Sequence, residues 1–113
     1  MKKVIFVAAP YFDLDKNIIE QRVHLVSKYC TKLLNKKICV LSPIIFGSTI
    51  LNHFVLPNDF SFWDQISYQY LSLSTEIHVL QLDGWQDSRG VKEEIYFARR
   101  NKIKIVYVSL NSI

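Results

Sequence analysis

The fold is decided by residues 4–43, which read VIFVAAPYFDLDKNIIEQRVHLVSKYCTKLLNKKICVLSP. The apolar run Val4–Ala9 ends at Pro10, and such a run predicts a buried strand. A second short apolar run, Ile38–Leu41, predicts another strand before Ser42–Pro43. The residues between the two runs have a helical pattern. The stretch therefore predicts a strand, a helix and a second strand, the repeating unit of a parallel sheet.

The helix of this unit is predicted from its cap and its apolar spacing. Asp13 or Asp15 can cap its start, and apolar residues then recur at spacings of three and four to about Lys36. The stripe consists of Ile19, Val23, Val26, Cys30, Leu33 and Leu34.

The rest of the chain continues the alternation of helices and apolar strands. In chain order, we expect a short helix at Ser48–Phe54, a long helix capped by Asp59 with Trp63, Ile66 and Tyr70 on one stripe, a strand at Glu76–Leu82, a polar turn at Asp83–Gly90, a helix at Gly90–Asn101 and a strand at Ile103–Val108. This order predicts a Rossmann-like or flavodoxin-like three-layer α/β sandwich with a four- or five-stranded parallel sheet.

The composition is typical of one globular domain over residues 1–113, with 50% hydrophobic and 21% charged residues. The net charge of +4 suits an anionic small molecule or nucleic acid, but it also fits a solvated basic surface. Because the basic residues are spread along the chain, we expect no nucleic-acid partner. They include Lys2–Lys3, Lys36–Lys37, Arg99–Arg100 and Lys102–Lys104.

Targeting segments and metal-binding motifs are not expected. The apolar stretch Val4–Pro10 is short for a signal peptide, and no run reaches the roughly 20 residues of a membrane helix, so we expect a cytoplasmic protein without a membrane partner. Cys30 and Cys39 have no CxxC or His/Cys spacing, so we expect two reduced thiols in the core, no metal and no cofactor.

Ligands of parallel sheets bind outside the carboxyl ends of the strands, which points to Ala9–Asp15, Ser42–His53 and Asp83–Glu94. In the last segment, Glu94 shares the sheet-facing helical stripe of Val91 and Ala98. A carboxylate there is costly to bury unless it is paired, hydrogen-bonded or protonated. It is a candidate functional group, or it offsets nearby basic residues and stabilises the helix start.

Other candidates lie beside the same sheet edge. Asp87 or Ser88 can cap the helix, and Gly90 permits close backbone approach, so free N–H groups there could hold an anion or a sugar hydroxyl. Tyr11, after Pro10, is a substrate contact or a rim aromatic. Arg22 snorkels from its apolar stripe or pairs with a buried carboxylate or phosphate.

The histidines carry weaker signals. His53 follows the second strand in the Ser42 segment, whereas His78 alternates with apolar neighbours and is expected to be a packed strand residue. The sequence contains no Ser-His-Asp or Cys-His signature, Walker loop or HExxH motif.

Five motifs recur in order: a strand ending in APY, the Arg22 helix, SPI after the second strand, FW on the next helix, and GW-xx-SRGV-xx-E-xxx-A at residues 84–98. In this pattern the chain resembles the nucleoside 2-deoxyribosyltransferase-like superfamily, especially its short, poorly characterised bacterial and phage branch. The resemblance implies cleavage of the N-glycosidic bond of deoxynucleosides or deoxynucleotides, with Glu94 as the nucleophile. It implies substrate contacts at Pro10, Tyr11, Arg22, His53, Asp83, Trp85, Asp87, Ser88 and Gly90.

The chain departs from the family pattern at several positions. Phe6 replaces a tyrosine, Ser67 and Thr75 replace acidic residues, and Phe46 and Ser48 stand where the short branch has histidines. Asp83 or Asp87 could take over the role of an acidic residue. The departures favour an alternative function, a nucleotide-sensing or nucleotide-sequestering module without turnover.

A third interpretation is an interaction domain, suggested by Phe54, Phe60, Phe62 and Trp63. These aromatics are expected in the core or at a dimer interface, and the resemblance implies a homodimer.

Overall fold

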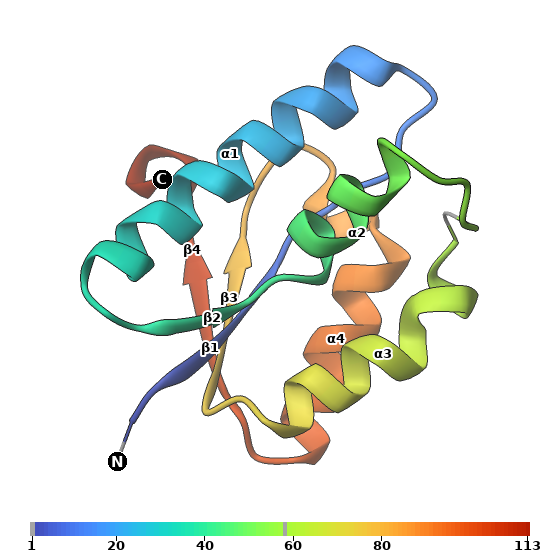
Figure 1. Cartoon of the computed structure of the whole chain (residues 1–113). Helices are drawn as coiled ribbons and strands as arrows, with labels where there is room; N and C mark the ends of the chain where they lie inside the picture. The colour runs from blue at the N-terminus through green and yellow to red at the C-terminus, as the bar shows by residue number, and fades with distance from the viewer. Residues whose placement is uncertain (1, 58) are drawn as a thin grey trace.

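The fold is a parallel sheet between two layers of helices, as the sequence predicts (Figure 1). The computed structural model describes residues 2–57 and 59–113. In these residues the sheet has four strands in the order β2-β1-β3-β4, all parallel. The strands are β1 (Val4–Ala8), β2 (Cys39–Leu41), β3 (Glu76–Leu80) and β4 (Lys104–Val108).

The helices divide between the two faces of the sheet. They are α1 (Lys16–Asn35), α2 (Pro43–Leu51), α3 (Phe60–Ser72) and α4 (Arg89–Arg100), with short 3₁₀ turns at Trp85–Asp87 and Leu110–Ser112. Helix α1 lies on one face with α2 packed against it, and α3 and α4 pack together on the other (Figure 1). This arrangement confirms the predicted three-layer α/β sandwich.

Two apolar cores follow from the alternation of side chains along β1. Ile5 and Val7 point toward α1, in a cluster with Val26 and Leu33. The intervening Phe6 and Ala8 belong to the opposite cluster, whose other buried members include Leu71, Ile77, Val79, Val91, Ile95 and Ala98. Burial on both faces explains why β1 is a continuous apolar run.

Polar side chains cap the helices. Asp15 caps α1 by accepting a hydrogen bond from the Asn17 amide at 2.9 Å, whereas Asp13 accepts one from the amide of Asp15. Asp59 caps α3, and Ser88 rather than Asp87 caps α4. These caps satisfy amides that have no partner inside their helices.

Three sequence expectations are wrong in detail. Helix α2 begins at Pro43 rather than Ser48, because Ser42 caps it and proline suits the first helical position. Cys39 is exposed, since it lies on the short edge strand β2. Leu34 is 55% exposed because it is turned about 100° from the buried Leu33.

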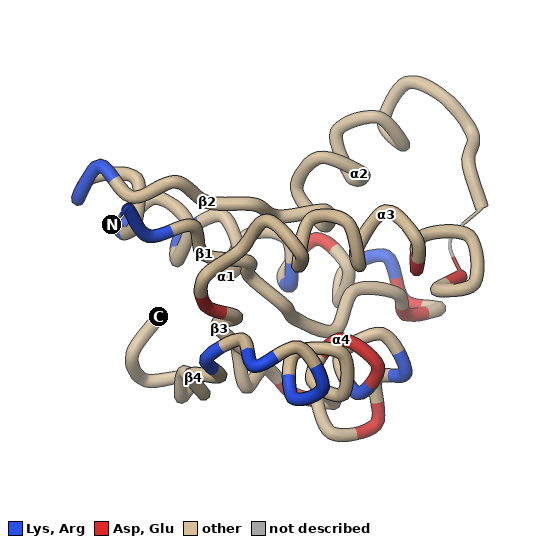
Figure 2. Tube along the Cα trace, turned by 90° about the horizontal axis from the view of Figure 1, so that it is seen from below, with Lys and Arg blue, Asp and Glu red and all other residues tan. Residues whose placement is uncertain are grey.

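The direction of strand connection reverses between β1 and β3, and ligands of such sheets bind at this point, beyond the carboxyl ends of the strands. Three lysine pairs of the sequence lie elsewhere. Lys2–Lys3, Lys36–Lys37 and Lys102–Lys104 precede or open strands, which places them at the amino-terminal edge (Figure 2). Across 2–57 and 59–113, no helix has the length and apolar character needed to span a membrane.

Candidate functional site

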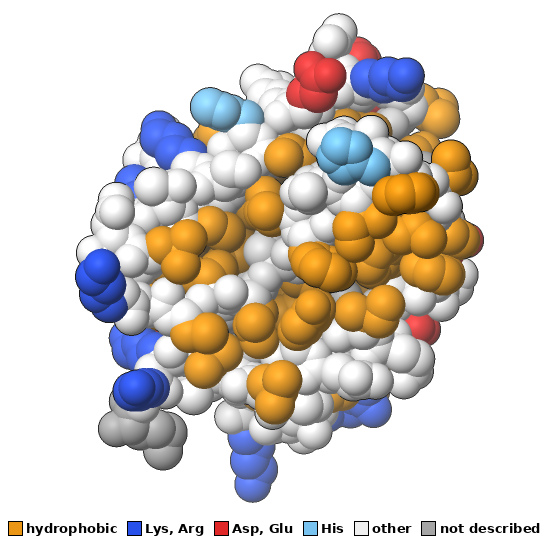
Figure 3. Space-filling model, in the orientation of Figure 1, with side chains coloured by type: hydrophobic (Ala, Val, Ile, Leu, Met, Phe, Trp, Pro, Cys, Tyr) orange, Lys and Arg blue, Asp and Glu red, His pale blue; other side chains and the backbone are white. Residues whose placement is uncertain are grey.

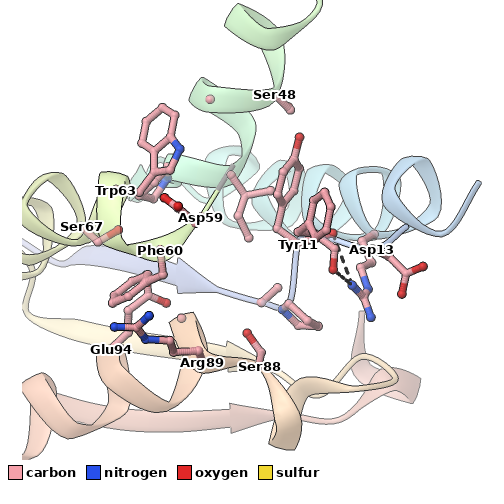
Figure 4. A pocket seen from close by; sticks show the side chains of 18 of the residues that line it. Tyr11, Asp13, Ser48, Asp59, Phe60, Trp63, Ser67, Ser88, Arg89 and Glu94 are labelled. Atoms are coloured by element: carbon pink, nitrogen blue, oxygen red, sulfur yellow. Dashed lines mark hydrogen bonds between the residues drawn. The ribbon is translucent and has the colours of Figure 1, made fainter. Parts of the chain in front are cut away.

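A cavity of about 840 Å³ opens at the carboxyl-terminal edge of the sheet (Figure 4). All three segments expected at this edge contribute to it. The residues of the predicted site that line the cavity are Pro10, Tyr11, Arg22, Asp87, Ser88, Gly90 and Glu94. The cavity therefore brings together residues of the predicted site that are up to 84 positions apart, from Pro10 to Glu94.

Glu94 is the most deeply placed carboxyl group of the cavity wall. It lies on α4 and is 8% exposed, as its position on the sheet-facing stripe predicts. Burial raises the pKa of Glu94 to about 8, while a hydrogen bond with the Ser67 side chain acts in the opposite direction. Glu94 can therefore exchange a proton near neutral pH, a property common among functional carboxyls.

Helix α3 supplies a wall of the cavity that was not included in the predicted site. Phe60, Trp63 and Ser67 all line the cavity from this helix. The indole N–H of Trp63 donates to the Pro57 carbonyl at 2.9 Å, which holds the ring in place. A Cβ atom on Gly47 of α2 would lie 3.3 Å from the Trp63 ring, so glycine allows α2 to approach closely.

The aromatic stripe of this helix was visible in the sequence, but its contribution to the cavity was not. The sequence predicts Trp63 in the core or at an interface, and Ser67 stands where the family pattern has an acidic residue. Their place in the site depends on how α3 packs against α4, and the spacing of neighbouring residues in the sequence does not predict this packing.

The start of α4 forms the opposite wall. The Ser88 hydroxyl accepts a hydrogen bond from the Val91 amide at 3.3 Å, which is the cap of this helix. Gly90 faces Phe60, and a Cβ at this position would lie 3.3 Å from the aromatic ring. Gly90 thus permits the close approach that its place in the sequence suggested, here toward α3.

Tyr11, in the loop that follows β1, lines the cavity (Figure 4), and Arg22 of α1 lines it as well. Burial raises the pKa of Tyr11, so its phenol remains a hydrogen-bond donor at neutral pH. The Arg22 guanidinium donates to the backbone carbonyls of Tyr11, Phe12 and Asp83.

Three residues of the predicted site are not among the residues that line the cavity in the described part of the chain. His53 is exposed just beyond the end of α2, and Asp83 is exposed in the loop after β3. Trp85 packs instead on the aromatic ring of Tyr107, with 5.8 Å between ring centroids, and it contacts the apolar core under α4.

The departures from the family pattern fall into two groups. Phe6, Ser48 and Ser67 line the cavity, so substitutions at these positions change its surface. Phe46 is exposed on α2. The Thr75 hydroxyl forms hydrogen bonds with the backbone N–H and carbonyl of Val4. These bonds lie at the amino-terminal edge of the sheet, opposite the edge at which the cavity opens.

The charges of the cavity differ from those of the whole chain. Its lining contains four acidic residues, Asp13, Asp59, Asp87 and Glu94, and two arginines, Arg22 and Arg89. The net charge of +4 therefore does not extend to this site. Within the described part of the chain, no group of three or more His, Cys, Asp and Glu residues is arranged to hold a metal ion.

The comparison with curated proteins found no match. A family model described as a domain of unknown function, DUF1937, matches residues 3–110 and so covers both layers of helices, the sheet and every residue of the cavity wall described above. On this match the chain belongs to the DUF1937 family.

Proposed function

We propose that the chain cleaves the bond between base and sugar in a nucleoside or nucleotide, as an N-glycosidase or a deoxyribosyltransferase. The observation that carries the proposal is the position of Glu94, a carboxyl 8% exposed in the wall of a cavity at the carboxyl-terminal edge of the sheet. The family resemblance of residues 84–98 supports the same residue as nucleophile.

In the proposed reaction, a carboxylate oxygen of Glu94 attacks the anomeric carbon of the sugar. The bond to the base breaks, its electron pair goes to the base nitrogen, and that nitrogen takes up a proton. The resulting glycosyl ester is then attacked at the anomeric carbon by water or by a nitrogen of a second base. The attacking group passes its proton to the carboxylate of Asp87, which has protonated the first base, and the bond to Glu94 breaks to free its carboxylate. Water gives hydrolysis, and a second base gives transfer.

Glu94 must lose its proton before it can attack. With its pKa at about 8, it is mostly protonated at neutral pH in the free protein. The transition state carries positive charge at the sugar, and this charge favours the ionised carboxylate beside it. The buried site thus stabilises the ionised nucleophile most strongly when the reacting sugar is present.

Asp87 is the residue we assign to protonation of the leaving base. Two of the other acidic residues in the lining have structural partners: Asp13 accepts from the Asp15 amide, and Asp59 accepts from the Phe62 amide. Asp87 lines the same cavity one residue before the cap of α4. Asp87 is one of the two aspartates, with Asp83, that the sequence offers in place of a missing acidic residue.

The two walls of the cavity suit different parts of a nucleoside. The rings of Phe60 and Trp63 provide an apolar aromatic surface for a base. Ser88 and Gly90, at the amino-terminal end of α4, suit the oxygens of a sugar or of a 5′-phosphate.

The test is release of free base, measured by mass spectrometry on mixed deoxynucleosides and deoxynucleoside monophosphates. Glu94→Gln keeps the shape of the side chain and should abolish release. Glu93→Gln is the matched control, since this neighbouring carboxyl does not line the cavity, and it should retain wild-type release. Release by wild type and Glu94→Gln at equal rates would contradict the proposal.

A nucleotide-binding module without turnover is the second candidate. It is favoured by Phe6 and Ser67, which line the cavity where the family resemblance leads us to expect a tyrosine and an acidic residue. Such a protein would retain one compound of the mixture through a desalting column and release no base. Base formation by wild type alone would exclude it.

We also propose that the chain pairs with a second copy of itself. Large hydrophobic side chains gather on the surface over α2 and α3 (Figure 3), where Phe46 is 54% exposed and Phe62 is 42% exposed. Exposed apolar groups that adjoin one another are typical of protein interfaces.

A further inference from the structure

We propose that Arg22 is a positioning residue that ties two loops together at the mouth of the cavity. One loop, residues 9–15, connects β1 to α1, and the other, residues 81–88, connects β3 to α4. Both loops contribute residues to the cavity lining. The family resemblance implies a substrate contact for Arg22, whereas the contacts of its guanidinium indicate that it acts through the backbone.

The hydrogen bonds of Arg22 connect the two loops directly. Its Nη1 atom donates to the carbonyl oxygens of Tyr11 at 3.3 Å and Phe12 at 3.0 Å. Its Nη2 atom donates to the carbonyl oxygen of Asp83 at 3.1 Å. Because the guanidinium is planar and its donors diverge in a fixed fork, one side chain fixes the separation of the two loops.

The local backbone is adapted to this contact. Gly84 follows Asp83 and has a φ angle of +87°, a conformation that favours glycine. A Cβ at this position would lie 3.0 Å from Nη2 of Arg22. Gly84 therefore provides both the turn and the space in which the guanidinium reaches the Asp83 carbonyl.

The contacts of Arg22 fix the positions of two parts of the cavity wall. The first loop presents Tyr11 to the cavity, and the second leads directly into Ser88 and the start of α4. If the loops separate, these groups lose their relative position across the cavity mouth. Misplacement of about 1 Å can reduce an enzymatic rate by about 100-fold. The effect on turnover rests on the proposed function, whereas the effect on the loops does not.

The experiment measures hydrogen exchange in peptides that cover residues 9–15 and 81–88, together with the kinetics of base release. Arg22→Met keeps the length of the side chain and removes every donor. It should speed exchange in both segments and lower kcat/KM by about 10- to 100-fold. Arg22→Lys, which keeps the charge but not the fork, should restore only part of either property.

Two further variants sharpen the test. Gly84→Ala should speed exchange in residues 81–88, because a Cβ there crowds Nη2 of Arg22 and strains a turn with a φ angle of +87°. Arg99→Met, at the exposed end of α4, is the matched control and should leave exchange in both segments unchanged.

The outcomes separate this proposal from the proposed function. If residues 9–15 and 81–88 of Arg22→Met exchange as slowly as in wild type, the positioning role is overturned. Loss of nucleotide binding in that same variant would then assign Arg22 to substrate contact. Faster exchange in both segments would support the positioning role even if wild type releases no base, a result that would count against the proposed function alone.

Discussion

The Nε2 atom of His78 lies 2.9 Å from Oε1 of Glu76, and both side chains are buried. They lie two residues apart on β3 and therefore share one face of the sheet. The hydroxyl of Tyr29, from α1, lies 2.6 Å from Nδ1 of the same histidine. Lys3 completes the group at 3.4 Å from the second carboxylate oxygen. His78 is thus the packed strand residue that the sequence predicts, with both ring nitrogens occupied.

This network should make the free energy of unfolding depend on pH in the acidic range. Hydrogen bonding with His78, assisted by Lys3 and opposed by burial, lowers the pKa of Glu76 below its ordinary value of 4.5. A lowered pKa contributes stability that is present above 4.5 and is lost as the pH falls through the folded value. Glu76→Gln should lower the free energy of unfolding by about 1–3 kcal/mol at neutral pH. Urea denaturation should show the difference from wild type shrinking below pH 4.5; a difference independent of pH would contradict this assignment.

Glu94 should affect stability in the opposite direction. Its pKa rises from 4.5 to about 8 on folding, so its contribution becomes unfavourable as the pH climbs from 4.5 and reaches its full cost above 8. Glu94→Gln should therefore stabilise the protein by an amount that grows over this range. The control Glu93→Gln should show no such growth. Thermal unfolding at a series of pH values measures both, and equal behaviour of the two variants would argue against a buried, protonated Glu94.

The pH dependence of turnover distinguishes two roles of Glu94. A nucleophile must be ionised, so kcat/KM should rise with pH and level off above about 8. A general acid must be protonated, and its activity would fall over the same range. Base release measured from about pH 5 to about pH 9 decides between them. A falling profile would move Glu94 from the attacking role to proton donation.

The proposed pairing of chains predicts a specific effect of charge on α2. Phe46→Glu places a carboxylate among the exposed apolar side chains over α2 and α3 and should convert a dimer into a monomer. Leu34→Glu on α1 is matched to it, because Leu34 is 55% exposed and Phe46 is 54% exposed. Light scattering at micromolar concentration gives the mass. A monomeric wild type, or dissociation by both variants alike, would exclude this surface as the interface.

A stabilising substitution is expected just after α1. Lys37 has a φ angle of +61°, where a side chain is strained and glycine is not. Lys37→Gly should raise the free energy of unfolding by about 1 kcal/mol. Lys36→Gly is the control, because Lys36 has a φ angle of −90° and should gain nothing. Chemical denaturation of the two variants compares them, and equal changes would show that strain at Lys37 is not the cause.

Much of the fold could be predicted because its signals are local. The apolar run of β1 and the helical spacing of α1 are patterns formed by residues only a few positions apart, and each pattern indicates which side chains are buried. The caps at Asp59 and Ser88 act on amides three residues away. Glu94 was found in the same way, because three- and four-residue spacings place it on the buried stripe of its own helix.

By itself, then, the sequence determined the alternation of strands and helices, the parallel sheet and the burial of Glu94. Only the tertiary structure decided what faces Glu94 across the cavity. Ser67 and Trp63 reach the site because α3 packs beside α4. Arg22 donates to the carbonyl of Asp83, 61 residues away, as well as to the loop that precedes its own helix. Such contacts form between segments distant along the chain, and their geometry is set by the packing of whole layers rather than by the spacing of neighbouring residues.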